Sequence, residues 1–188
     1  PLTLAETASV FGEMLTFKKM LENAKDQNER KVLLAGKVED MINTVIRQIA
    51  FYDFECKLHE ARKAGELTPD DINALWMSVQ GESLGPAFEF MDGYETFWAY
   101  IPHFVHSPFY VYAYAFGDGL VNALYAVYEA APDGFQEKYF DMLKAGGSQH
   151  HKDLLAPFGL DASDPTFWQQ GLSMISSMID ELEAMETP

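Results

Sequence analysis

Residues 32–49 read VLLAGKVEDMINTVIRQI and carry apolar side chains at intervals of three and four positions. These apolar positions are Val32, Leu33, Val38, Met41, Ile42, Val45, Ile46 and Ile49. That spacing is typical of an amphipathic helix, whose period is 3.6 residues. No proline interrupts the pattern before Gly65, so we predict one long helix of about 50 Å at a rise of 1.5 Å per residue. Gly36 is the expected point of a bend.

Capping signals predict further helices on both sides of this one. The expected ranges are Leu4 to about Lys25 behind a Thr3–Glu6 capping box, Thr68 to about Val79, Ser107 to before Pro132, Asp133 to Lys144, Ser148 to Leu155, and Asp164 to about Met185. Gly117 and Gly119 fall inside one of these helices, where small residues permit close helix contact. No apolar–polar alternation long enough for a strand occurs, so we expect an all-α multi-helix bundle, with residues 1–188 as a single unit.

Composition excludes several classes of function. The chain of 188 residues has 29 acidic and 13 basic residues and a formal charge of −16, which repels nucleic-acid phosphates and anionic membrane surfaces. Cys56 is the only cysteine, so an intrachain disulfide is impossible. No apolar run has the length that a membrane span requires. We therefore expect a soluble cytoplasmic protein that binds neither nucleic acid nor membrane.

The most unusual window is HFVHSPFYVYAYAFG, residues 103–117. His103, His106, Tyr110, Tyr112 and Tyr114 all donate hydrogen bonds, and such donors can stabilise a developing negative charge. A buried tyrosine hydroxyl needs a partner, so leucine or alanine would serve a plain core better. An aromatic core and a binding or catalytic site both stay open on this window alone. On a helix, Tyr110 and Tyr114 share a face and Tyr112 lies roughly opposite.

Acidic and histidine residues recur at spacings close to those of metal-binding motifs. The segment from His59 to Lys63 begins like a His-Glu-x-x-His zinc motif but ends in lysine, which cannot bind zinc, so we expect a surface or packing role. Glu55 and His59 are four residues apart, which does not match the Glu-x-x-His spacing of di-iron sites. Glu6 and Glu13 are seven apart and share a helical face. They are either metal-site carboxylates or a capping glutamate and a solvated charge.

The run TLAETASVFGE, residues 3–13, resembles the segment that follows the His-Glu-x-x-His helix in zinc metallopeptidases of the oligoendopeptidase F group, relatives of thimet oligopeptidase. The resemblance continues through residues 101–104 (IPHF), 107–115 (SPFYVYAYA), 146–148 (GGS) and 164–168 (DPTFW). It therefore covers nearly the whole chain in order.

This resemblance implies a role for each candidate. Glu6 would complete a His, His, Glu zinc shell, and Glu13 would orient a ligand without touching the ion. His103, Tyr110 and Tyr114 would bind substrate and stabilise the oxyanion of the tetrahedral intermediate. His106 and Tyr112 would be further substrate contacts.

The family's two histidine ligands and its general-base glutamate are absent from this sequence and are expected upstream of Pro1. The resemblance thus implies the C-terminal part of a zincin-like helical catalytic domain, with one zinc ion completed by the upstream part. Its substrates would be oligopeptides, and the piece alone would be inactive. An exposed cleft wall would also leave apolar surface on which copies could pair as a homo-oligomer. The alternative is a non-catalytic all-α binding or structural module with an aromatic-rich core.

Overall fold

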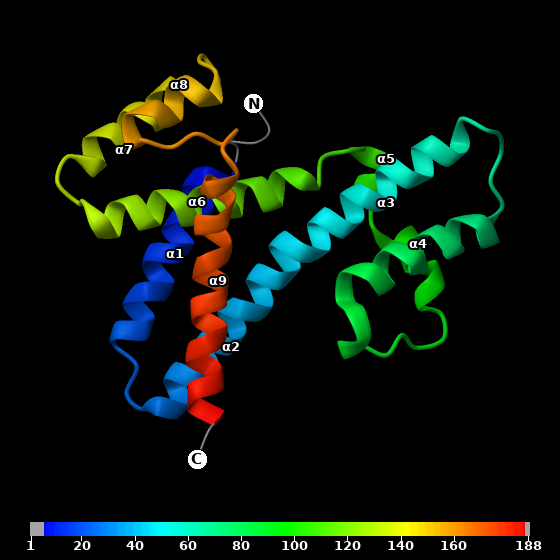
Figure 1. Ribbon diagram of the computed structural model, residues 1–188, viewed down its shortest axis with the longest axis horizontal. Helices are drawn as coiled ribbons and strands as arrows, with labels where there is room; N and C mark the ends of the chain where they lie inside the picture. Colours follow the sequence, from blue (N-terminus) through cyan, green and yellow to red (C-terminus); the bar gives the residue numbers. More distant parts are fainter. Residues whose placement is uncertain (1–5, 187–188) are drawn as a thin grey trace. The chain divides into compact units, whose positions relative to one another are not determined.

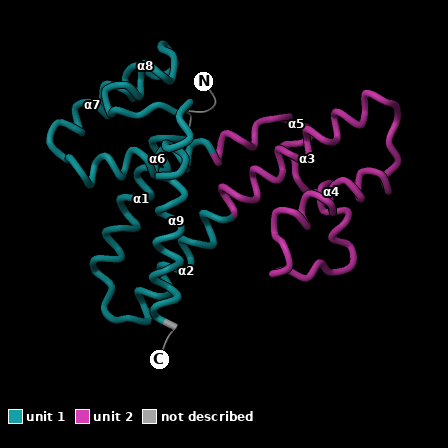
Figure 2. Tube along the Cα trace, in the orientation of Figure 1, with its two compact units in different colours: residues 1–42, 116–188 teal, residues 43–115 magenta. Residues whose placement is uncertain are grey.

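The computed structural model describes residues 6–186, and within that range every regular element is a helix (Figure 1). The expectation of an all-α fold is confirmed for the part described. The chain divides into two compact units, shown in Figure 2: unit 1 comprises residues 1–42 and 116–188, and unit 2 comprises residues 43–115.

The long apolar stretch forms helix throughout but not of one kind. Helix α2 (Gln27–Met41) leads into a π-helical turn, η2 (Ile42–Ile46), and then into α3 (Arg47–Arg62). The irregularity therefore lies at the π turn and not at Gly36, where α2 is unbroken. The extra residue of a π turn shifts the apolar stripe around the helix axis. The boundary between the two units falls at this turn, between Ile42 and Asn43.

Unit 1 contains α1 (Thr7–Glu22), α2, most of α6 (Tyr112–Ala130), α7 (Phe135–Ala145), α8 (His151–Leu155) and α9 (Pro165–Glu186). Helix α2 packs against both α1 and α9 (Figure 1). An ion pair between Arg30 and Glu181, 2.6 Å long, joins α2 to α9. The predicted starts of α7 and α9 are confirmed to within two residues. The predicted start of the first helix, with Thr3 and Leu4, lies outside the described residues.

Glycines permit close packing between α6 and α9, as the sequence predicts. A Cβ at Gly119 would lie 2.9 Å from the ring of Trp168, which is closer than side chains tolerate. A Cβ at Gly171 would lie 3.3 Å from the carbonyl oxygen of Gly119. Only glycine at these two positions lets the backbones approach without moving a neighbour.

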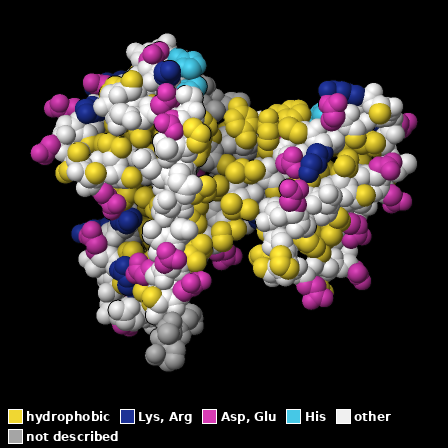
Figure 3. Space-filling model, viewed as in Figure 1, with side chains coloured by type: hydrophobic (Ala, Val, Ile, Leu, Met, Phe, Trp, Pro, Cys, Tyr) yellow, Lys and Arg dark blue, Asp and Glu magenta, His cyan; other side chains and the backbone are white. Residues whose placement is uncertain are grey.

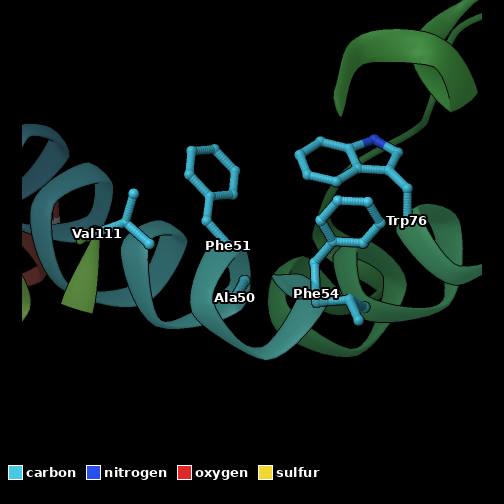
Figure 4. Close-up of a cluster of buried hydrophobic side chains, with 6 residues drawn as sticks. Ala50, Phe51, Phe54, Trp76 and Val111 are labelled. Atoms are coloured by element: carbon cyan, nitrogen blue, oxygen red, sulfur yellow. The ribbon is translucent and has the colours of Figure 1, made fainter. Parts of the chain in front are cut away.

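Unit 2 is built around an aromatic core between α3 and α4 (Pro69–Leu84). Phe51 and Phe54 of α3 and Trp76 of α4 contribute rings to this cluster, which Figure 4 shows with Ala50 and Val111. The rings of Phe54 and Trp76 meet edge to face, with centroids 5.2 Å apart. At the start of α4, Thr68 is the N-cap that the sequence predicts, with Pro69 in the first turn, and Thr68 and Asp71 form a capping box.

The segment after α4 is irregular, as its glycines and prolines predict. It contains two 3-10 helices, η3 (Gly85–Ala87) and η4 (Tyr94–Tyr100), followed by the single-turn helix α5 (His103–His106). The indole of Trp98 donates to Asn73 of α4 at 2.7 Å and thereby fastens η4 to that helix.

Acidic side chains lie on the surface of both units in the view of Figure 3, consistent with the formal charge of −16. Over residues 6–186, no helix combines the length and the apolar character that crossing a bilayer requires.

Candidate functional site

The turn between α5 and α6 gives the window 103–117 its shape. The sequence predicts a helix that starts at Ser107 and Pro108, but α6 begins only at Tyr112, so that prediction is wrong. The reason is Phe109, whose φ of 59° lies in the left-handed region and cannot continue a right-handed helix. Residues 107–110 instead form a turn, closed by the N–H of Tyr110 donating to the carbonyl of Ser107 at 3.2 Å.

This turn brings three of the predicted site residues together in unit 2. The Nε2 atom of His103 lies 3.1 Å from the hydroxyl of Tyr114, within hydrogen-bond distance. The ring of Tyr110 lies 5.3 Å from that of Tyr114 and 6.0 Å from that of His103, centroid to centroid. All three side chains are half-buried, so each contacts the protein and keeps part of its surface accessible.

The other two predicted contacts lie apart from these three. Tyr112 packs its ring against Tyr52 of α3, with centroids 5.4 Å apart. His106 is exposed at the end of α5. Tyr110 and Tyr114 therefore lie together and Tyr112 lies apart, although Tyr110 precedes the helix. The roles of all five residues stay predictions.

Glu55 of α3 is a residue that the sequence analysis dismissed. Its side chain is 1% exposed, and its Oε1 atom accepts a hydrogen bond from the backbone N–H of Phe109 at 2.8 Å. Burial raises the pKa of the Glu55 carboxyl, while the Phe109 N–H and the nearby His59 and His103 lower it. The available signal was an acid inside the apolar stripe formed by Phe51, Phe54 and Leu58.

His59 has the surface and packing position that the sequence predicts for it. It is exposed, and its ring lies 4.8 Å from that of Phe109. The ring of Tyr52 meets Phe109 edge to face at 6.0 Å. Phe109 is thus held by contacts to two residues of α3 as well as by its backbone hydrogen bond to a third.

Glu6 and Glu13, the predicted metal-site carboxylates, lie in unit 1. Glu6 is half-buried just before α1 and accepts a hydrogen bond from the Ser9 hydroxyl, with Oγ 3.2 Å from Oε2. Its Cβ lies 3.3 Å from where a Cβ at position 117 would be, so Gly117 leaves room for it. Glu13 is exposed on α1, and Thr3, the partner in the expected capping box, is outside the described residues.

Asp118 is a second buried acid that the sequence analysis did not single out. It is 2% exposed on α6 and accepts a hydrogen bond from the side-chain amide of Asn122 at 2.9 Å. Burial raises its pKa to about 6, against the opposing effects of Lys37 and Asn122, and the charges of Asp40 and Glu13 add to the rise.

A zinc site needs three or four suitable ligands. In the described part of the chain, no three His, Cys, Asp or Glu side chains gather closely enough to hold an ion. Glu6 offers a carboxylate, which is an acceptable zinc ligand. The described residues therefore do not form a complete zinc site by themselves, although Glu6 has the chemistry of one ligand.

The sequence is similar to a family of known peptidases along most of its length. A family model described as Peptidase family M3 matches residues 1–174. Oligoendopeptidase F, plasmid, from Lactococcus lactis subsp. cremoris is 32% identical over 186 residues, which cover 98% of this chain and 31% of that protein. Oligopeptidase PepF from Bacillus subtilis is 31% identical over 183 residues, or 97% of this chain and 27% of the relative.

A solved structure shows the same similarity in three dimensions. The crystal structure of oligoendopeptidase-F from Enterococcus faecium matches with a TM-score of 0.86 at 28% sequence identity, over 97% of this chain and 35% of that one. The chain thus spans about a third of the length of the relatives that it matches.

Proposed function

The chain belongs to peptidase family M3, and from that premise we propose that it is the C-terminal part of the catalytic domain of a zinc-dependent oligoendopeptidase. The whole enzyme would hydrolyse oligopeptides. This part would supply one metal ligand, Glu6, and the wall that faces the substrate. The upstream part of the same protein would supply two histidine ligands and the general-base glutamate.

The observation that carries the proposal is the convergence of His103, Tyr110 and Tyr114. Their hydrogen bond and ring contacts join residues from α5, the following turn and α6. A core of rings alone would not need an imidazole within 3.1 Å of a phenol hydroxyl. Two polar donors placed together and half-exposed are what an oxyanion-binding surface requires.

The chemistry that this chain contributes concerns charge stabilisation. With its proton on Nε2, His103 would donate to the Tyr114 oxygen, and the Tyr114 hydroxyl would donate to a substrate oxygen in the complete enzyme. This second hydrogen bond would stabilise the oxyanion formed when water attacks the scissile carbonyl. Loss of one such donor costs about 3 kcal/mol of transition-state stabilisation in well-studied oxyanion holes. Tyr110, stacked beside His103, would restrict the imidazole's orientation and contact the bound peptide.

Glu6 would act at the metal. Glu6 and two upstream histidines would hold a zinc ion, whose chemistry when bound is Lewis-acid polarisation of the scissile carbonyl and activation of water. The Ser9 hydroxyl, which donates to Glu6, would fix the orientation of the carboxylate. Glu13 would contribute from the same helix without touching the ion.

The two roles separate in the complete enzyme. Tyr114→Phe should keep stoichiometric zinc and lose about 100-fold or more in kcat, because one transition-state donor is lost. Glu6→Gln should lose zinc, because a neutral amide is a poor ligand. Metal analysis and peptide-cleavage kinetics measure both effects.

Tyr94→Phe is the matched control, because it removes a hydroxyl that hydrogen-bonds Gln80 at 3.1 Å, away from His103. It should keep both zinc and turnover. Full zinc content in the Glu6 variant would remove Glu6 from the metal site, and wild-type kcat in the Tyr114 variant would remove the proposed oxyanion donor. The 188-residue chain alone should bind no stoichiometric zinc and cleave no peptide.

A further inference from the structure

The turn that carries Tyr110 depends on an unusual backbone conformation. Phe109 is the one non-glycine residue with positive φ among those the structure describes, at 59°. The left-handed region is strained for a residue with a bulky side chain and persists only where the surroundings hold it. Functional sites are where such residues gather.

A hydrogen bond to a buried acid, Glu55, stabilises this backbone conformation. Glu55 reaches a partner 54 positions away in the sequence when its Oε1 accepts from the Phe109 N–H at 2.8 Å. A helix-borne carboxylate that is 1% exposed has few rotamers, so the acceptor's position is fixed. The bond fixes the direction of the peptide group that enters Phe109, and the rings of His59 and Tyr52 fix its side chain.

The neighbourhood of Glu55 is otherwise costly for an acid. Its second oxygen, Oε2, is buried and has no hydrogen-bond partner in the described structure. Replacing such a residue by leucine would fit the apolar stripe better, so packing does not explain the glutamate. The function that does explain it is the one hydrogen bond to the turn.

The position of the turn decides the geometry of the proposed oxyanion wall. Tyr110 follows Phe109 directly, and Val111, which is 0% exposed, anchors the chain in the core immediately before α6. A rotation at Phe109 would therefore move α5, which carries His103, relative to this anchor and to the first turn of α6, which carries Tyr114. The 3.1 Å contact between Tyr114 and His103 would be lost with it.

We propose that Glu55 is a positioning residue that clamps the 107–110 turn through the Phe109 N–H and so aligns Tyr110 and Tyr114 with His103. The inference rests on the proposed function for its effect on catalysis. Its structural content, the dependence of the turn on Glu55, is independent of any activity.

The test uses the complete enzyme and three variants. Glu55→Gln keeps an oxygen acceptor for the Phe109 N–H, whereas Glu55→Leu keeps the size and removes the acceptor. Gln80→Leu is the control, since Gln80 is also a fully buried polar residue of unit 2 but contacts Tyr94 instead. Crystal structures, zinc content, melting temperature, kcat and KM are measured for each.

Glu55→Leu should keep zinc, move Phe109 to negative φ and separate the Tyr114 hydroxyl from His103. Its kcat should fall by about 100-fold, the scale of a 1 Å misplacement, with a smaller change in KM. Glu55→Gln should restore both the turn and most of kcat. Gln80→Leu should lower the melting temperature without lowering kcat.

Two outcomes would overturn the clamp. One is a Glu55→Leu structure in which Phe109 keeps positive φ and the Tyr114–His103 contact is intact. The other is a loss of kcat in Gln80→Leu that matches the loss in Glu55→Leu. If Glu55→Leu disturbs the turn as expected while Tyr114→Phe leaves kcat unchanged, the clamp stands and the proposed oxyanion role fails.

Discussion

Among the residues that the structure describes, each unit buries one acid, and the two acids have different kinds of partner. Asp118 of unit 1 finds its partner on its own helix, four residues on, at Asn122. Glu55 of unit 2 finds its partner 54 residues away, at a backbone N–H in a strained turn. A hydrogen bond to a partner on the same helix satisfies the carboxylate without constraining the path of the chain elsewhere. A distant partner fixes the path of the chain, and here that path leads into the candidate site.

The first prediction concerns the cost of the local arrangement. The ordinary pKa of the Asp118 carboxyl is 3.8, and burial raises this pKa to about 6 in the folded protein. Between these two pH values, the folded state therefore keeps a proton that the unfolded state has released. Raising the pH through this window therefore lowers the free energy of unfolding, by up to roughly 3 kcal/mol from this group. Asp118→Asn keeps the acceptor for Asn122 and should abolish that decrease in urea titrations from pH 4 to pH 7.

Asp133→Asn is the control, because Asp133 is an exposed acid in unit 1. It should keep the wild-type pH profile. If the free energy of unfolding of the Asp118 variant depended on pH as it does in the wild type, burial would not raise the pKa of Asp118. The contrast with Glu55 would then be lost.

The second prediction tests the packing beside Asp118. Gly119→Ala places a methyl group 2.9 Å from the Trp168 ring, whose indole N–H is itself fastened to the Ala162 carbonyl. Overpacking should cost about 2 kcal/mol of stability despite alanine's better helix propensity. Gly36→Ala, a helical glycine with no atom within 4 Å of the added Cβ, should instead stabilise by up to about 1 kcal/mol. Equal denaturation midpoints for the two variants would contradict the close approach of α6 and α9.

The third prediction isolates the strain at Phe109. Phe109→Gly and Phe109→Ala lose the same ring contacts, so their difference reports the backbone alone. At a φ of 59° glycine is free of the Cβ penalty, and the glycine variant should be more stable by about 1 kcal/mol. At positions with negative φ, an alanine variant is usually more stable than the glycine variant. If Phe109→Ala were more stable than Phe109→Gly, the turn would not be strained.

The smallest effect is expected at Gly117. An added methyl group would lie 3.3 Å from the Cβ of Glu6, a contact that a slight shift relieves. Gly117→Ala should change stability by less than about 0.5 kcal/mol. In the complete enzyme it should nevertheless weaken zinc binding by up to about tenfold, because it moves a proposed ligand. Competition with a chelator measures this, and unchanged affinity would separate Gly117 from the metal site.

The same contrast between local and distant partners explains what the sequence could predict. The N-cap at Thr68, the starts of α7 and α9, and the role of the glycines in α6 depend on near neighbours or on residue size, and they are confirmed. Helical spacing also placed Tyr110 and Tyr114 together and Tyr112 apart, although the turn before α6 means that this agreement is partly fortuitous.

What failed depends on contacts between residues far apart in sequence. Ser107 and Pro108 have the composition of a helix start, but the contact between Glu55 and Phe109 imposes a turn there. The π turn at Ile42–Ile46 is a separate failure, because it falls in a stretch whose local pattern continues smoothly and gives no signal for it. Glu55 itself was judged by its spacing to His59, whereas its partner lies on another element.

In the proposed enzyme the Tyr114 hydroxyl, held by His103, faces the oxyanion. A crystal structure of the complete enzyme with a phosphinic peptide, which mimics the tetrahedral intermediate, is the decisive measurement. We expect the Tyr114 oxygen within about 3 Å of a phosphinyl oxygen, with the His103 contact retained and Glu6 bound to zinc. A phosphinyl group bound by other donors, with Tyr114 remote from it, would show that Tyr114 is not the oxyanion donor.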